Sequence, residues 1–432
     1  MKPTLKFDRT LVTVLVDEVV HVLLELVAPP AAPVRRPPLD VVVALDRSGS
    51  MSGAPLAAVT SATAQLLRLA GPDDRIGVVA FDEYVQMVLP LAQHDPEAAA
   101  AAVLALQAGG TTNLSGGWLK ALEMLAGKRR PDALRRVILL TDGHANVGIT
   151  EPDELVTFVR GAGAQGVSTS CIGFADGYDE HLLAALADAG HGNDYWCDGP
   201  DQAAKVFADE FGGLASVVAQ NVSVEIVPSL RVAAAAVLNE FPITEVPGGL
   251  QVAMGDAYGS EHRKLVAKFH LRPAQAPGPI DVADLVIRWA AVLGDVALHT
   301  VTVPVVVTAG DGDAPDPGAD TGVREEVLRL EVARNRREAG DAARRGDFLA
   351  ASSLLRAGAV LMSALPGERD LVEELTRDAD ALAAQMWTEA DAKRTFSRAR
   401  GTSRGRRTDY TAAGPDPAPD AGPGPAPDGP DA

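Results

Sequence analysis

The chain has little cysteine and no long apolar run. Only Cys171 and Cys197 occur among its 432 residues, too few for a disulfide framework or a zinc cluster, and we expect both thiols to be buried. No uninterrupted apolar stretch reaches the roughly 20 residues that a membrane helix needs. Charged residues also interrupt the first hydrophobic run, as they would not in a secretory signal. We therefore expect a cytoplasmic protein that does not bind membranes.

Positive charge is also in short supply. The chain has 39 Lys plus Arg against 58 Asp plus Glu, which gives a net charge of −19. This balance disfavours nucleic acid as a general partner. The hydrophobic content of 47% can build sizeable cores, and the length predicts about two to four domains.

Sequence motifs of several enzyme classes are absent. After the apolar stretch at residues 39–45, neither a P-loop nor a G-x-G-x-x-G fingerprint follows to bind phosphates. Residues 49–53 read Gly-Ser-Met-Ser-Gly, which differs from the G-x-S-x-G of many hydrolases. No paired histidine and acid is apparent beside these serines. We predict that the protein is not an enzyme, with a hydrolase as a less favoured alternative.

The pattern of strands and helices divides the chain into six segments. From residue 39 to 219 strands and helices alternate, which predicts an α/β, Rossmann-like domain with a doubly wound, mostly parallel sheet. Later strands favour an antiparallel β-sandwich, and the two N-terminal strands cannot bury themselves alone. We expect them to join that sandwich, with the α/β domain inserted between. The expected segments are 1–38 (N-terminal strands), 39–219 (α/β domain), 220–309 (sandwich), 310–322 (linker), 323–387 (helices) and 388–432 (tail).

The C-terminal tail is basic at first and then rich in Pro and Asp. The basic segment 393–407 could bind an acidic partner or, weakly, nucleic acid. Few aromatic residues accompany its charges, which favours a solvated segment instead. We predict disorder throughout residues 388–432.

Oxygen-bearing side chains follow several of the predicted strands. Asp46, Ser48 and Ser50 come directly after the strand at 39–45. Thr112 precedes a predicted helix, and Asp142 ends another strand. The carboxyl ends of parallel strands share one edge of a sheet, so these five residues can meet there. Three hydroxyls and two carboxylates suit a hard cation, although serine and aspartate in such turns also commonly cap helices.

The order Asp-x-Ser-x-Ser, then Thr, then Asp resembles the metal-ion-dependent adhesion site of the von Willebrand factor A domain, in a bacterial cytosolic form. The resemblance covers about residues 39 to 219. It implies Mg²⁺ (or Mn²⁺) held by Ser48, Ser50 and Thr112, with Asp46 and Asp142 acting directly or through water. One coordination position stays open for an Asp or Glu of a partner. We expect the partner-facing rim to include Met51, Asn113 and His144.

This resemblance implies a metal-dependent protein–protein interaction module, an adaptor or scaffold. The layout is similar to that of plant RING-type ligases and inter-alpha-trypsin-inhibitor heavy chains, but the chain lacks the cysteine clusters of a RING. Proteins of this kind often act beside AAA+ ATPases, phosphatases or stress-response components, so we expect a partner of one of these classes. The alternative is a structural or regulatory protein in which the metal only stabilises the fold.

Overall fold

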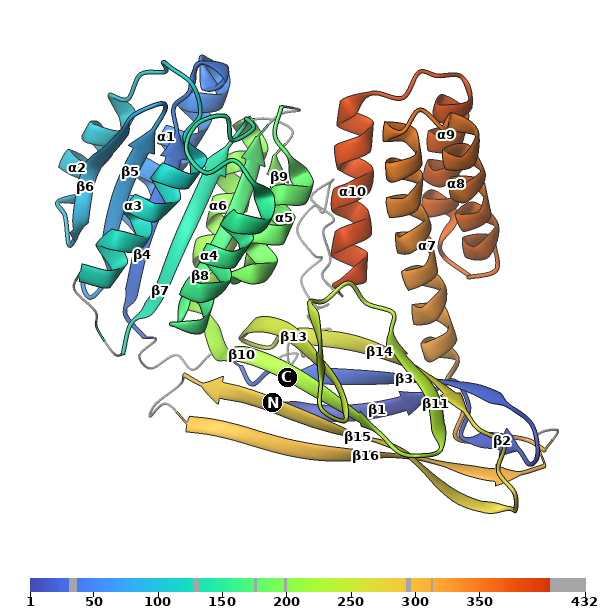
Figure 1. Cartoon of the computed structure of the whole chain (residues 1–432). Helices are drawn as coiled ribbons and strands as arrows, with labels where there is room; N and C mark the ends of the chain where they lie inside the picture. Colours follow the sequence, from blue (N-terminus) through green and yellow to red (C-terminus); the bar gives the residue numbers. More distant parts are fainter. Residues whose placement is uncertain are drawn as a thin grey trace, which may run out of the picture.

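A six-stranded sheet with helices on both faces occupies the first half of the chain (Figure 1). Its strand order is β6-β5-β4-β7-β8-β9, and only the edge strand β6 runs antiparallel. This confirms the predicted Rossmann-like α/β fold. The strands are β4 (Leu39–Asp46), β5 (Arg75–Phe81), β6 (Val85–Ala92), β7 (Leu134–Thr141), β8 (Val167–Phe174) and β9 (His191–Cys197).

Strand β4 shows why the sheet is covered on both sides. All eight of its residues are buried. Val41 and Val43 pack with the helices of one face, and Val42 and Ala44 pack with those of the other, because successive side chains of a strand point in opposite directions. One face carries α1 (Ala54–Leu69), α2 (Pro96–Leu104) and α6 (Pro200–Ala215), and the other carries α3 (Leu114–Gly127), α4 (Pro152–Ala164) and α5 (Glu180–Ala189).

Two further sheets lie below the α/β domain in Figure 1 and enclose a single hydrophobic core. One has the strand order β1-β3-β14-β11 and the other β12-β13-β10-β15-β16-β2. Strands from before residue 28 thus pair with strands from after residue 217. The strands are β1 (Lys2–Phe7), β2 (Leu11–Thr13), β3 (Glu18–Val27), β10 (Val217–Pro228), β11 (Val232–Val237), β12 (Ile243–Val246), β13 (Gly249–Tyr258), β14 (His262–Leu271), β15 (Gly278–Ala291) and β16 (Ala297–Gly310).

The C-terminal part is helical, as predicted. Helices α7 (Thr321–Arg344), α8 (Phe348–Ser363) and α9 (Arg369–Ala383) share a small apolar core. A fourth helix, α10 (Glu389–Ser403), lies between α7 and the α/β domain (Figure 1).

The computed structural model describes residues 1–30, 37–127, 130, 132–174, 177–197, 200–292, 297–311 and 314–404. No helix within these ranges is long and apolar enough to cross a membrane. Cys171 and Cys197 are both buried and free, which confirms the expectation for the two thiols.

The prediction of disorder throughout residues 388–432 is wrong for α10. Thr388 and Asp391 form a reciprocal capping box that starts the helix. Arg400, only 8% exposed, then forms ion pairs with Asp188 and Asp194 of the α/β domain. Arg400 therefore pairs with half-buried acids of the α/β domain and does not belong to a solvated face. The rest of the predicted tail, residues 405–432, lies outside the described residues.

Substituting Arg400→Ala should lower the free energy of unfolding by about 2 kcal/mol, because it leaves two half-buried carboxylates with less positive charge nearby. Arg369→Ala is the matched control. It removes an exposed pair with Glu373 on one helix surface, and its effect should stay within about 0.5 kcal/mol. Urea denaturation of both variants measures the difference, and equal small effects would show that α10 is not held by these ion pairs.

Candidate metal centre

The five predicted ligands lie at the carboxyl edge of the six-stranded sheet. Asp46 is the last residue of β4, and Asp142 directly follows Thr141, the last residue of β7. Strands β4 and β7 are neighbours in the sheet. Thr112 lies just before α3, so three loops bring their side chains to one place.

The hydroxyl and carboxylate oxygens of these loops are within reach of one another. Ser48 Oγ and Ser50 Oγ are 3.1 Å apart. Ser50 Oγ donates to Asp142 Oδ1 at 2.7 Å. A Cβ atom added to Gly143 would lie 3.3 Å from Thr112 Oγ1 and 3.7 Å from Ser50 Oγ. The structure therefore brings these predicted oxygens together beside Gly143.

Asp46 organises the loop that follows β4. Its side chain is fully buried, Oδ1 accepts from the Ser48 backbone N–H at 2.8 Å, and Oδ2 accepts from Thr141 Oγ1 at 2.6 Å. Both carboxylate oxygens thus already have donors. Thr141 is a site residue that the sequence motif does not include. Its place immediately before Asp142, at the end of a buried strand, was the available signal.

Backbone hydrogen bonds join the three loops. Gly49 N donates to Gly110 O at 3.0 Å, and Gly109 N donates to Arg47 O at 2.9 Å. Arg47 also forms an ion pair of 3.0 Å with Asp82, the residue after β5. These contacts hold the loops after β4 and β5 against the segment that carries Thr112. The site is therefore held together by the backbone of the domain and by this ion pair.

Three further hydrogen bonds position Thr112 itself. Its carbonyl oxygen accepts from the N–H groups of Asn146 and Val147, both at 3.2 Å, and its own N–H donates to Asn146 Oδ1 at 2.8 Å. The loop after β7 therefore holds Thr112 in place. Asn146 was also missed from the sequence, where nothing in the motif pointed to it.

The expected rim is corrected at one position. Met51 is fully buried in the apolar core beneath the sheet edge, because the short 3-10 turn Gly49–Met51 directs its side chain inward. It cannot face a partner. Asn113 is half-buried and accepts from Gly116 N at 2.9 Å, which caps α3. His144 is exposed, and its contact with a partner stays a prediction.

Burial gives the two carboxylates an unusual electrostatic setting. It raises the pKa of Asp46 to about 6, although hydrogen bonds from Thr141 and Ser48 act in the opposite direction and the charge of Asp142 adds a small increase. Burial likewise raises the pKa of Asp142. Two partly desolvated acids on neighbouring loops repel each other when both are ionised. A cation between them would offset both the cost of desolvating the two carboxylates and the repulsion between their charges.

The donor set fits a hard divalent cation. It consists of oxygen alone, from two carboxylates and three hydroxyls, which Mg²⁺ and Mn²⁺ accept. Among the residues that the structure describes, no three His, Cys, Asp or Glu side chains are grouped to bind a metal. The hydroxyl of Ser50 bonds to that of Ser48 and donates to Asp142, so both of these hydrogen bonds join oxygen atoms.

Comparison with known proteins gives matches to the α/β domain and to most of the chain. The family model of the von Willebrand factor type A domain matches residues 40–207. An uncharacterised protein of Synechocystis sp. is 27% identical over 340 residues, 75% of this chain and 79% of that protein. E3 ubiquitin-protein ligase WAV3 of Arabidopsis thaliana is 29% identical over 55% of this chain, but the match spans only 32% of the ligase.

Among solved structures, von Willebrand factor type A from Catenulispora acidiphila is similar over nearly the full length. The match has a TM-score of 0.73 and covers 92% of this chain and 96% of that chain, at 18% sequence identity. At this identity the likeness shows the fold alone.

The raised pKa of Asp46 predicts a pH dependence of stability in metal-free protein. A carboxyl with a pKa near 6 when folded and about 4 when unfolded binds its proton more tightly in the folded state. The free energy of unfolding should therefore fall as pH rises from about 4 through about 6. Urea denaturation in EDTA of wild type and Asp46→Asn measures this component, which the variant should lack. Parallel pH curves for the two proteins would contradict it.

Proposed function

We propose that the protein is a metal-dependent protein-binding module, because residues 40–207 match the family model of the von Willebrand factor type A domain. In this proposal a divalent cation at the carboxyl edge of the sheet binds an Asp or Glu carboxylate of a partner protein. One observation carries the proposal: two acids and three hydroxyls converge there, and Ser50 in their midst is exposed to solvent.

The residues divide into two roles in this proposal. Ser48, Ser50 and Thr112 would hold Mg²⁺ or Mn²⁺ directly, because their neutral oxygens leave the ion attractive to an incoming carboxylate. Asp46 would act through water, since both of its oxygens already accept hydrogen bonds. Asp142 accepts from Ser50 and would supply charge beside it. When bound, the cation supplies a Lewis-acid centre for a carboxylate.

We further propose a cytoplasmic adaptor or scaffold without enzymatic activity. The relative named as a ubiquitin ligase extends well beyond the matched region, since the match spans 32% of it. The two cysteines of this chain are buried and far from forming the clusters that a RING needs. An AAA+ ATPase, a phosphatase or a stress-response component remains the proposed class of partner, recognised through an acidic side chain.

Substituting Ser50→Ala should weaken Mg²⁺ or Mn²⁺ binding about tenfold or more, because it removes a ligand and the donor to Asp142. Ser52→Ala is the matched control: Ser52 is a neighbouring exposed serine outside the cluster, and its loss should leave the Kd unchanged. Isothermal titration calorimetry measures both. Equal affinities of wild type and both variants for Mg²⁺ or Mn²⁺ would show that the ion binds at another site.

Partner binding should depend on the same ion. Affinity capture from native lysate with wild-type protein in Mg²⁺ should retain a partner that is lost in EDTA and with Ser50→Ala, but kept with Ser52→Ala. Capture of the same proteins under every condition would contradict the adaptor mechanism. If metal binding is lost in Ser50→Ala while capture is unaffected, the metal serves the fold alone.

A further inference from the structure

Helix α10 contacts the α/β domain beside its edge strand β9. The helix follows α9 in the chain, yet it lies beside α5 and β9 of the α/β domain (Figure 1). Its side chains form ion pairs with three acids there: Glu180, Asp188 and Asp194. The contacts join segments more than 200 residues apart.

Lys393, near the N-terminal end of α10, contacts the α/β domain through Tyr178 and Glu180. Its side chain is only 1% exposed. The ammonium donates to the carbonyl oxygen of Tyr178 at 2.6 Å and to Glu180 at 2.9 Å, and it lies 4.2 Å from the centre of the Tyr178 ring. A buried ammonium is stable only with such partners. The position of Tyr178 is therefore tied to α10.

Tyr178 in turn lies against the sheet edge that carries Asp142. Its ring packs so closely over Gly173, near the end of β8, that a Cβ atom there would lie 2.4 Å from ring carbons. Gly173 pairs with Thr141 on the neighbouring strand. Gly177 comes equally close to Asp142: a Cβ atom on it would lie 2.6 Å from the Asp142 carbonyl oxygen. Packing this tight transmits displacement.

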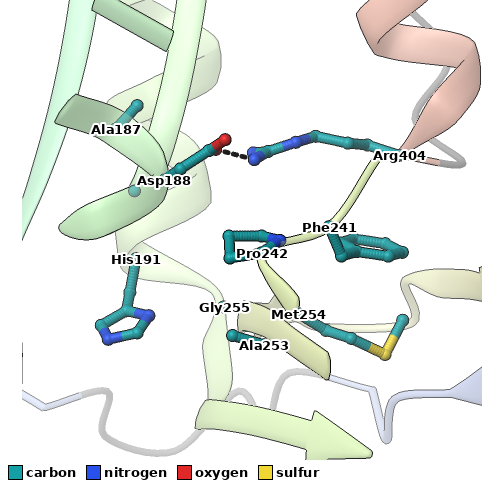
Figure 2. Close-up of a pocket in the computed structure, with 10 residues that line it drawn as sticks. Ala187, Asp188, His191, Phe241, Pro242, Ala253, Met254, Gly255 and Arg404 are labelled. Carbon is teal, nitrogen blue, oxygen red and sulfur yellow. Dashed lines mark ion pairs between the residues drawn. The ribbon is translucent and has the colours of Figure 1, made fainter. Parts of the chain in front are cut away.

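Other ion pairs hold the C-terminal end of α10 against the α/β domain. Arg400 donates to Asp188 at 2.6 Å and to Asp194 at 2.6 Å. Arg404, just past the helix, forms an ion pair with Asp188 across a small pocket that Phe241 also lines (Figure 2). With both ends held, the helix presents Lys393 to Tyr178 in one fixed place.

We infer that Lys393 is a positioning residue for the candidate metal centre. It acts through Tyr178 and Gly177 on the backbone of Asp142, so that docking of α10 and cation affinity are coupled. The inference rests on the proposed function for its effect on the cation. The contact path itself consists of residues of this chain, and it can be tested without metal.

The experiment compares wild type with Lys393→Met by hydrogen exchange and calorimetry. In metal-free protein, amides of residues 142–149 should exchange about fivefold faster or more in the variant, because the loop after β7 loses its support. The Kd for Mg²⁺ should rise by a similar factor. Glu180→Gln, which keeps the shape of the side chain, is the second variant and should shift both in the same direction.

Lys264→Met provides the matched control. It removes a second, more exposed ammonium, which pairs with Glu326 of α7 at 2.8 Å and lies on β14, outside the α/β domain. It should lower stability without changing exchange in residues 142–149 or the Kd for Mg²⁺. This separates positioning from a general loss of stability.

The outcomes distinguish the inference from the proposed function. Unchanged exchange in residues 142–149 in both Lys393→Met and Glu180→Gln overturns the inference, even if the wild type binds Mg²⁺. Faster exchange in these variants together with no binding of Mg²⁺ or Mn²⁺ by wild type overturns the proposed function and supports the contact path. Faster exchange with weaker Mg²⁺ binding supports both.

Discussion

The buried carboxylate of Asp46 is the constraint on which the candidate site depends. It takes a hydrogen bond from the backbone of Ser48 on one side and from the hydroxyl of Thr141 on the other. Hydrogen bonds to a charged group contribute about 1.5 to 3 kcal/mol each. Together they fix the turn after β4 relative to the end of β7, so that Ser48 and Ser50 project toward Asp142.

The frame that carries this site is joined to the rest of the chain by buried charges. Arg136 on β7 is 1% exposed and donates to Glu210 of α6 at 2.7 Å and to Asp256 of β13 at 2.9 Å. Separating these groups would leave an unpaired charge in the interior, which is strongly unfavourable. The α/β domain is thus held to the neighbouring sheet by β7, the strand that ends at the site, while α10 holds it from the side.

The meeting of the predicted ligands follows from local sequence, whereas the orientation of Met51 and the burial of Lys393 do not. The strand ends of a parallel sheet share one edge, so the meeting of Ser48, Thr112 and Asp142 can be predicted from the order of strands and motifs alone. The inward turn of Met51 depends on a single 3-10 turn that the motif does not specify. The burial of Lys393 depends on Glu180, 213 residues away, which no local pattern encodes.

The proposed function depends on a divalent cation that binds among the oxygens of the three loops. Anomalous diffraction from crystals of the protein soaked in Mn²⁺, recorded at the manganese absorption edge, tests it directly. We predict one peak within coordination distance of Ser48, Ser50 and Thr112, and its loss in Ser50→Ala crystals. A wild-type crystal with no peak at this edge of the sheet, or with manganese only elsewhere, would show that these loops do not bind the cation.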